Sequence, residues 1–284
     1  MINKDTKFLI VGLGLIGGSY AKGLHKNGYT VYALAHKQSD IDYALKEGFI
    51  DKGSAEVDKD LLKEADVIIV SLYPVKEVEW LKENQQYIRP GTLITDVCGI
   101  KSGVIDVIQD FLREDLEMIA CHPMAGKEVY GVINSDEKIF EKANYIVVPT
   151  EKNTNEAIED AKKIGEILNF ANISTLSVEE HDNIIGFVSQ LTHILAVTLM
   201  TCNEDEHLEK YTGDSFRDLT RIARINENMW TELFIMNKKA LLEQITSFED
   251  QLSLIKRLLI AEESEDLKEI FRKSTKRRAL FDKK

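Results

Sequence analysis

The sequence contains little cysteine, and the few thiols that it has exclude a disulfide framework. Cys98, Cys121 and Cys202 are widely separated, and none belongs to a Cys-x-x-Cys pair. We therefore interpret them as small buried thiols and predict no metal site. A reducing, cytoplasmic location is expected.

The chain also lacks an excess of positive charge and a long hydrophobic run. Lys and Arg number 36 against 48 Asp and Glu, and the resulting net charge of −12 disfavours nucleic acid or an anionic membrane as a partner. The longest apolar stretch, Phe8–Gly18, is too short to cross a bilayer. With 284 residues, of which 44% are hydrophobic, the chain is long enough for two globular domains.

Short apolar runs alternate with amphipathic stretches through the first half of the chain. The runs that predict strands are Phe8–Val11, Thr30–Leu34, Val67–Leu72, Thr92–Thr95 and Glu117–Ala120. Helical patterns between them predict an α/β fold, a Rossmann-type doubly wound parallel sheet that is covered on both faces. Two later runs, Tyr145–Val148 and Ile173–Leu176, flank a predicted helix at Asn155–Phe170 and complete a sheet domain at 1–177.

The rest of the chain has the pattern of helices only. No proline follows Val178, and apolar residues recur at helical spacing, as at Ile184, Val188, Leu191 and Leu195. We predict an all-helical substrate and dimerisation domain at 178–284. Its apolar stripes exceed what one layer of helices against the sheet can cover, so we expect a homodimer.

A glycine-rich segment, Gly12-Leu13-Gly14-Leu15-Ile16-Gly17, joins the first predicted strand to a helical stretch. Glycine lets the chain turn tightly, lets a pyrophosphate approach the backbone, and lets the helix pack close to the strand. The helix N-terminus adds amide donors and partial positive charge. This context predicts a dinucleotide cofactor. Its predicted contacts are Gly12, Gly14, Leu15, Ile16 and Gly17, with Ser71 at the end of a later strand.

The end of the second strand lacks the acidic residue that would bind the ribose 2′-hydroxyl of NAD. The segment there reads Ala33-Leu34-Ala35-His36-Lys37-Gln38-Ser39, and nothing in it repels a 2′-phosphate. Because His36, Lys37 and Ser39 could bind such a phosphate, NADP is predicted to serve at least as well as NAD. The alternative for His36 and Lys37 is an exposed turn.

Two polar segments, Thr95–Lys101 and Cys121–Gly126, follow predicted strands at the edge where open α/β sheets bind ligands. His122, in the second segment, is expected beside the nicotinamide. Its ordinary pKa of about 6.5 suits a general base at neutral pH. We therefore favour a catalytic role for His122 over a structural one.

The helical half carries Arg217, Arg221 and Arg224 within eight residues. An arginine can clamp a carboxylate with two parallel hydrogen bonds. On one helix, the spacing allows only some of the three arginines to face the same cleft. For each of them, the alternative to binding a substrate carboxylate is a structural ion pair within the protein. The same half contains the segments Glu180-His181-Asp182, Ser189-Gln190-Leu191-Thr192-His193 and Met229-Trp230.

In this order, the segments between Phe8 and about Asn237 resemble the prephenate dehydrogenase family. They are the glycine loop, Asp-Val-x-x-x-Lys, His-Pro-Met-Ala-Gly, His-Asp with Thr-His, and Arg-Ile-Ala before Met-Trp. The resemblance implies an NAD(P)-dependent oxidoreductase of tyrosine biosynthesis that converts prephenate into 4-hydroxyphenylpyruvate and CO2. Arogenate, which gives tyrosine directly, is the alternative substrate.

The resemblance also implies roles for individual residues. His122 takes the place of the histidine that binds the ring hydroxyl of the substrate and removes its proton. His193 matches a second active-site histidine, and Arg221 matches an arginine that binds a substrate carboxylate. Trp230 occupies the Met-Trp position of the family.

Further positions are implied at the edge of the same site. Glu128 and Asp218 resemble acidic residues that form a network near the entrance. Gly99 departs from the family, which commonly has serine there, so a hydroxyl partner of the catalytic histidine is either missing or supplied from elsewhere. Because the substrate is a dianion, Lys101 and Lys127 are further candidates to bind it.

Two other functions compete with this interpretation. A two-domain Rossmann dehydrogenase of another small hydroxy acid would share the glycine loop, although such enzymes often use a lysine base. A regulator that senses NAD(P) without turnover would need neither His122 nor Arg221.

Overall fold

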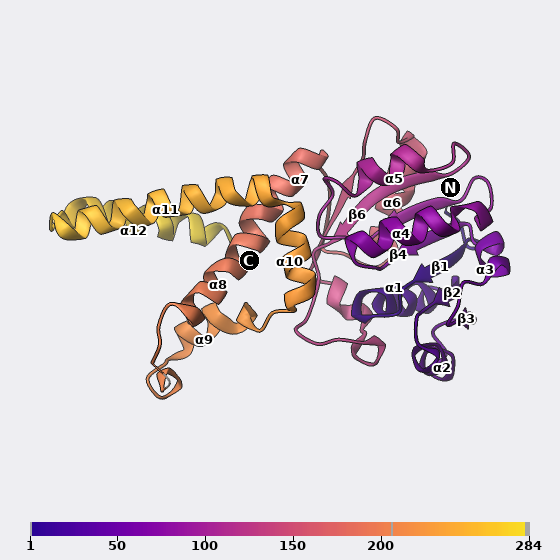
Figure 1. The fold of residues 1–284 in the computed structure, drawn as a ribbon, viewed down its shortest axis with the longest axis horizontal. Coiled ribbons are helices and arrows are strands. Elements are labelled where there is room, and N and C mark those ends of the chain that lie inside the picture. The colour runs from indigo at the N-terminus through magenta and orange to yellow at the C-terminus, as the bar shows by residue number, and fades with distance from the viewer. Residues whose placement is uncertain (1, 206, 282–284) are drawn as a thin grey trace. The chain divides into compact units, whose positions relative to one another are not determined.

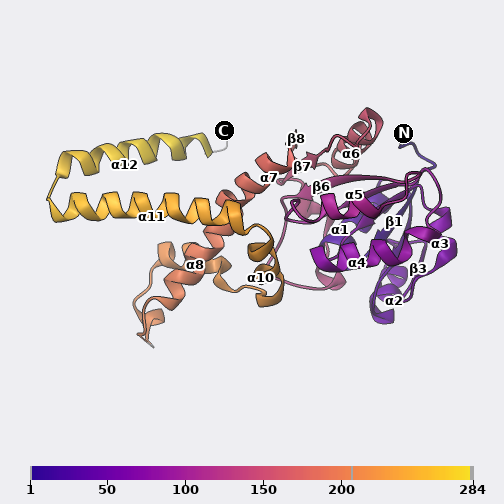
Figure 2. The same cartoon turned by 45° about the horizontal axis from the view of Figure 1, so that its top comes forward.

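The structure, a computed structural model, describes residues 2–205 and 207–281 and has two compact units. The first unit, Met1–Asn237, contains the sheet and every predicted site residue. The second unit, Lys238–Lys284, contains two long helices, α11 (Lys238–Ile260) and α12 (Ser264–Arg278), which lie side by side (Figure 1, Figure 2).

An eight-stranded sheet forms the core of the first unit, with strand order β3-β2-β1-β4-β5-β6-β7-β8. Its strands are β1 (Lys7–Val11), β2 (Thr30–Leu34), β3 (Lys52–Ser54), β4 (Val67–Val70), β5 (Leu93–Asp96), β6 (Glu117–Pro123), β7 (Asn144–Val148) and β8 (Asn172–Thr175). Neighbouring strands are parallel except β6 and β7. The order from β3 to β6 is that of a dinucleotide-binding Rossmann sheet, so the predicted fold class is confirmed.

The sequence patterns predicted seven of these strands to within a few residues and missed β3. That strand reads Lys-Gly-Ser and has no apolar run, because it lies at the sheet edge, where it pairs with β2. Apolar periodicity reports burial, and a short edge strand buries little.

Helices cover both faces of the sheet, as its doubly buried strands require. Alternate residues of β1 face opposite ways: Phe8 and Ile10 pack with one hydrophobic cluster, and Leu9 and Val11 pack with the other. The first cluster is covered by α1 (Leu15–Lys26), α2 (Gln38–Lys46) and α6 (Asn155–Ile167). The second is covered by α3 (Lys59–Glu64), α4 (Pro74–Asn84) and α5 (Ile105–Phe111) (Figure 2).

The remainder of the first unit is helical, as predicted. Its elements are α7 (Val178–Ile185), a π-helical turn (Gly186–Leu191), α8 (Thr192–Thr201), α9 (Asp214–Thr220), a 3₁₀ turn (Arg221–Ala223) and α10 (Glu227–Met236). Ile185 and Leu233 join the second hydrophobic cluster, so α7 and α10 pack onto the sheet domain.

The stretch Val178–Thr201 forms one helix that is long and apolar enough to cross a membrane by length and composition, with a mean hydropathy of 1.7 and 28% of the scored window buried. Its polar residues His181, Asp182 and Gln190 are nevertheless buried inside the first unit.

Cys202, which directly follows this helix, is exposed, so the prediction of three buried thiols is wrong for this residue. The neighbouring residues Leu199 and Met200 are also exposed, so the described part of the single chain leaves this end of the helix uncovered.

Candidate active site

The glycine loop between β1 and α1 has the shape that a dinucleotide requires. Gly12 has a φ of +100°, and a Cβ there would lie 2.4 Å from the Ser71 carbonyl oxygen. A Cβ on Gly17 would lie 1.9 Å from the Gly12 carbonyl oxygen, whereas a Cβ on Gly14 would meet no described atom within 4 Å. Two of the glycines are thus needed for close packing of the loop, and Gly14 faces open space.

The first turn of α1 can supply phosphate ligands. Gly14 is its N-cap residue and offers no side-chain oxygen to the first amides of the helix, which belong to Leu15, Ile16 and Gly17. These amides and the positive end of the helix dipole suit a pyrophosphate. Since a Cβ would fill the space beside Gly14, the residues present fit a dinucleotide.

The residues predicted to select the cofactor lie at the adjacent strand end. The amide of Gly12 donates to the Leu34 carbonyl at 2.8 Å, which joins the loop to β2. His36, Lys37 and Ser39 are all exposed around the start of α2. The three could therefore meet a phosphate that extends from the ribose.

His122 lies on the part of β6 that extends beyond its pairing with β5. That pairing ends at Ile119, and the side chains of Asp96 and Lys101 replace it. Asp96 Oδ1 accepts from the Cys121 amide at 2.8 Å, and Lys101 Nζ donates to the Cys121 carbonyl at 2.7 Å. Both backbone groups of Cys121, the residue before His122, are thus held by side chains from the end of β5 and from the loop that follows it.

The placement of Lys101 corrects its predicted role. Its side chain is 1% exposed, and its Nζ lies 2.5 Å from Asp96 Oδ2. Burial opposes the charged ammonium, but Asp96, Cys98 and Glu77 together outweigh this effect, so the pKa of Lys101 is raised and the group stays charged. A direct substrate contact does not fit, because the ammonium is enclosed and already bonded.

An unusual acidic group lies beside this ion pair. Glu77, Asp96 and Cys98 bring potential metal-ligand atoms within 4.8 Å of one another. Burial and then Asp96 raise the pKa of Glu77 well above its ordinary value. The Lys101 ammonium already bonds Asp96 as its cation, so we assign the group to the structural support of the β5 end.

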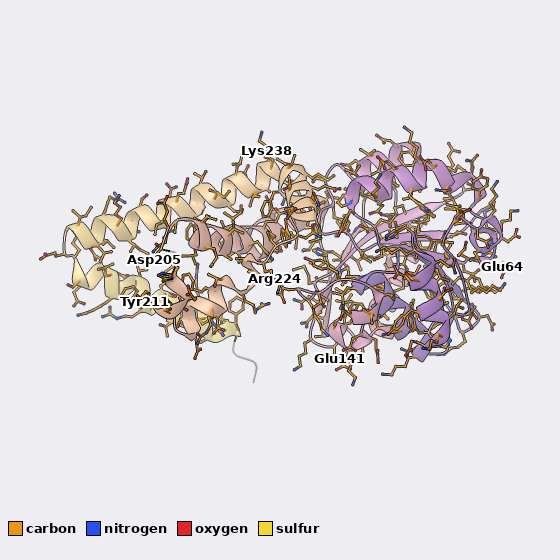
Figure 3. All side chains as sticks on the ribbon, turned by 60° about the horizontal axis from the view of Figure 1, so that its bottom comes forward. Glu64, Glu141, Asp205, Tyr211, Arg224 and Lys238 are labelled. Carbon is orange, nitrogen blue, oxygen red and sulfur yellow. The ribbon has the colours of Figure 1, made fainter. Side chains whose placement is uncertain are left out.

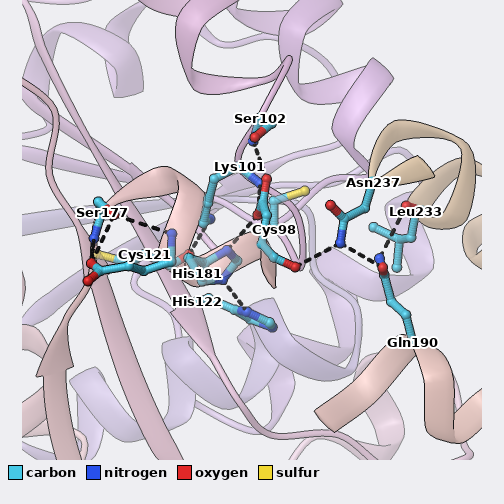
Figure 4. Close-up of polar contacts among 12 residues, drawn as sticks. Cys98, Lys101, Ser102, Cys121, His122, Ser177, His181, Gln190, Leu233 and Asn237 are labelled. Carbon is cyan, nitrogen blue, oxygen red and sulfur yellow. Dashed lines mark hydrogen bonds and ion pairs between the residues drawn. The ribbon is translucent and has the colours of Figure 1, made fainter. Parts of the chain in front are cut away.

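A chain of hydrogen bonds runs from His122 into the helical region (Figure 4). His122 Nδ1 lies 2.9 Å from His181 Nε2, and His181 Nδ1 lies 2.7 Å from Asp182 Oδ1. Asp182 also accepts from the backbone amides of Lys101 at 3.1 Å and Ser102 at 2.8 Å. His181 and Asp182 are buried, at 0% and 3% exposure.

The surroundings keep His122 neutral. Burial lowers its pKa well below the ordinary value, and nearby His181 and the Lys101 ammonium act in the same direction. Burial likewise lowers the pKa of His181, although Asp182 opposes it. A general base must be unprotonated to act, so this environment favours the active form of His122.

The sequence patterns gave no role to His181 or Asp182, although their segment stood out. Ser177 and Glu180 could have predicted where this helix begins, because these residues form a capping box at the start of α7. With the helix start fixed, His181 and Ile185 share one face, and both are buried.

A second group surrounds His193 on α8. Its ring packs against that of Trp230 at a tilt of 31°, with the ring centroids 3.7 Å apart, and its Nδ1 lies 2.8 Å from the Ser189 carbonyl oxygen. Arg221 forms an ion pair with Glu128. Burial lowers the pKa of His193, while the Ser189 carbonyl and then Glu128 oppose it and Arg221 adds to it. This ion pair is therefore close enough to His193 to influence its charge.

The other charged candidates lie farther from this group. Asp218 is exposed on α9, and Arg217 pairs with Asp214 at 2.5 Å on the same helix. Arg224, labelled in Figure 3, is exposed after the 3₁₀ turn. Of the three arginines, Arg221 is the one that the structure joins to the sheet domain.

Gly99 and α10 connect the two groups. A Cβ on Gly99 would lie 3.7 Å from His122 Nε2 and 3.9 Å from Leu233 Cδ1. Leu233 follows Trp230 by three residues, so both lie on the same side of α10. The predicted residues His122, Gly99, His193, Trp230, Arg221 and Glu128 therefore border one region.

Two buried amides that the sequence patterns did not reveal fix α10 in this position (Figure 4). Gln190 Nε2 donates to the Leu233 carbonyl at 3.2 Å. Asn237 Nδ2 donates to Gln190 Oε1 at 2.7 Å and to the Asp182 carbonyl at 2.9 Å. Gln190 lies in the π-helical turn, an irregularity that apolar periodicity does not predict.

Comparison with known proteins agrees with this arrangement. Residues 20–171 match the family model described as prephenate dehydrogenase, nucleotide-binding domain, and residues 177–273 match prephenate dehydrogenase, dimerization domain. The chain belongs to the prephenate dehydrogenase family. It is 33% identical to a prephenate dehydrogenase of Lactococcus lactis over 95% of this chain and 76% of that protein. It is 32% identical to one of Bacillus subtilis over 95% of this chain and 73% of that protein.

A solved structure of another prephenate dehydrogenase has the same fold. It comes from A. aeolicus, in complex with hydroxyphenyl propionate and NAD+, and is 28% identical to this chain. The TM-score is 0.90, with 98% of each chain covered.

Proposed function

We propose that this protein is a prephenate dehydrogenase that converts prephenate into 4-hydroxyphenylpyruvate and CO2 with NAD(P). The observation that carries the proposal is a neutral histidine at the sheet edge, whose Nε2 borders the space at Gly99, in a member of this family. The ligand of the A. aeolicus relative, a hydroxyphenyl propionate, has a ring hydroxyl and a carboxylate. His122 and Arg221 are the groups here that would bind such ends.

The residues of this chain divide the chemistry between them. A nicotinamide cofactor held by the Gly12–Gly17 loop would supply the acceptor for the hydride on the carbon that bears the ring hydroxyl. His122 Nε2 accepts the hydroxyl proton, and Arg221 exchanges Glu128 for a substrate carboxylate. His193 and Trp230 form one wall and orient the ring. Loss of CO2 makes the ring aromatic, so the reaction is effectively irreversible.

Assays of the purified protein with prephenate, arogenate and a small hydroxy acid, each with NAD or NADP, test the proposal. We expect reduced cofactor to form with prephenate. Turnover of arogenate alone would make the substrate assignment wrong. Turnover of the hydroxy acid alone would indicate a different dehydrogenase, and cofactor binding without any turnover would indicate a regulator.

Arg221→Ala is expected to raise the KM for prephenate with little change in kcat. Removal of a charge-assisted bond to a carboxylate in a cleft costs about 2 kcal/mol or more, which corresponds to at least about a 30-fold rise. Steady-state kinetics measure both constants. Arg217→Ala and Arg224→Ala serve as matched controls, and the assignment of Arg221 is wrong if either has the larger effect.

Cofactor choice can be tested at the end of β2. NADP is proposed to serve at least as well as NAD, since Ala35 leaves no carboxylate there and His36 and Lys37 are exposed donors. Ala35→Asp is expected to shift preference toward NAD, because it adds an acceptor for the ribose hydroxyl and repels a 2′-phosphate. The measurement is kcat/KM for each cofactor before and after the change. A native preference for NAD of about tenfold or more, near 1.4 kcal/mol, would contradict the proposal.

The protein is further proposed to be a cytoplasmic homodimer with domains at 1–177 and 178–284. The matched dimerization domain and the exposed side chains of Ile184, Phe187, Val188 and Met200 support a second copy covering the apolar helix. Free cysteines are consistent with a reducing compartment. Sedimentation at micromolar concentration should show twice the 32.3 kDa chain mass, and a monomer would contradict this.

A further inference from the structure

The hydrogen bonds between His122, His181 and Asp182 allow one arrangement of protons when all three groups have their expected charges. Asp182 accepts two backbone amides, and these bonds and His181 outweigh its burial, so its pKa is lowered and it is ionised. An ionised carboxylate can only accept, so His181 Nδ1 must carry the proton between them.

The direction of the next bond follows from the first. Neutral His181 with a proton on Nδ1 has a bare Nε2, which can only accept. His122 Nδ1, 2.9 Å away, must therefore donate to it. Neutral His122 then has its lone pair on Nε2, the atom that borders Gly99.

We propose that His181 and Asp182 are positioning residues that hold His122 in the Nδ1–H tautomer and so make its Nε2 the base. The pair acts on the Nδ1 side of the ring, whereas a side chain at position 99 would meet its Nε2 side. When Nε2 takes the proton of the substrate, His122 becomes positively charged. Its Nδ1–H then donates to His181, which is itself hydrogen-bonded to the Asp182 carboxylate. This inference rests on the proposed function only for its last step, because the tautomer is a property of the protein without substrate.

Burial supports this role over a purely structural one. His181 is fully enclosed, and the bond between the two rings excludes water as a competing partner for His122 Nδ1. The charged groups that influence the pair are Asp182 on α7, Asp96 at the end of β5 and Lys101 in the following loop. Asp96 and Lys101 bond each other, so Asp182 supplies the negative charge that directly contacts His181.

Nitrogen NMR of the 15N-histidine-labelled full chain tests the tautomer directly. We expect His122 to show a protonated Nδ1 and a bare Nε2 at neutral pH. Asp182→Asn can turn an amide N–H toward His181 and so reverse both tautomers, as an asparagine does beside a catalytic histidine in serine proteases. A His122 that is protonated on Nε2 in the wild type, or unchanged in Asp182→Asn, would overturn the proposal.

Two substitutions of His181 separate positioning from packing. His181→Gln keeps an acceptor for His122 and a donor for Asp182, and kcat is expected to stay within about tenfold. His181→Leu removes both, and kcat is expected to fall by about 10²-fold, in the lower range of general-base effects. Equal losses in the two variants would indicate a packing role. Cofactor affinity reports whether each variant is folded.

A pH profile adds a readout that packing would not change. In Asp182→Asn, kcat/KM should be low at every pH, because His122 Nε2 then carries a proton. The acid limb of the residual activity should move to lower pH, because loss of the carboxylate disfavours the protonated histidine pair. An unmoved limb would contradict the coupling. If the wild-type protein does not oxidise prephenate at all, the proposed function fails, while the NMR result still decides the tautomer.

Discussion

Replacement of His122 by asparagine is expected to lower kcat for prephenate by about 10²- to 10⁴-fold, the usual contribution of general-base catalysis. Asparagine can keep a hydrogen bond to His181 but cannot accept the hydroxyl proton. The affinity for the cofactor should change by no more than a few-fold, because the glycine loop joins β1 to α1, whereas His122 lies on β6. Steady-state kinetics and a cofactor titration measure the two effects.

His25→Asn is the matched control for this prediction. His25 lies in the last turn of α1 near Asp51, far along the helix from the glycine loop, and should be dispensable for turnover. Normal turnover in His122→Asn would remove His122 from the mechanism. A comparable loss in both variants would point to a general effect of the substitution on the protein.

Gly17→Ala is expected to weaken cofactor binding by more than tenfold, because the loop cannot keep its shape. The new Cβ would lie 1.9 Å from the Gly12 carbonyl oxygen, so backbone must move. Overpacking of this kind costs about 1–3 kcal/mol of stability. Thermal unfolding should show a lower Tm, and titration should show a cofactor Kd raised more than tenfold, or about 1.4 kcal/mol.

Gly14→Ala separates loss of the cofactor from loss of the loop. Its Cβ meets no described atom within 4 Å. The free energy of unfolding should therefore fall only by the cost of alanine at an N-cap, about 1 kcal/mol or less, and the Tm should change little. The cofactor Kd should still rise, because the methyl group lies where the pyrophosphate approaches the backbone. Unchanged affinity in Gly14→Ala would mean that the dinucleotide does not lie against this loop.

The fold was predictable where burial leaves a periodic pattern. Val67–Val70 is an apolar run buried on both sides, and the strand was expected there. β3 leaves no such pattern, and neither does the π-helical turn. Gln190 in this turn bonds Leu233 and Asn237, which are distant in sequence, so its contacts leave no local pattern either. The antiparallel pairing of β7 with β6 also depends on tertiary arrangement rather than on local sequence.

The candidate site was predictable as a set of segments, but not as a set of contacts. His122 and the glycine loop could be placed because a strand end and a helix start define their positions. Lys101 was assigned to substrate because its charge is visible in the sequence, while its enclosure by Asp96 is not. The hydrogen bond between His122 and His181 joins residues 59 positions apart, which no local pattern reports.

The dependence of kcat/KM for prephenate on pH tests the account most directly, since it combines the substrate, the base and its environment in one profile. A base with a lowered pKa is unprotonated at all higher pH values, so activity should be constant from about pH 8 to below pH 6.5, the ordinary pKa of histidine. It should fall only in more acidic solution, as His122 takes up a proton. A limb at or above about pH 6.5, or no turnover of prephenate at any pH, would contradict a neutral, buried His122 acting as the base.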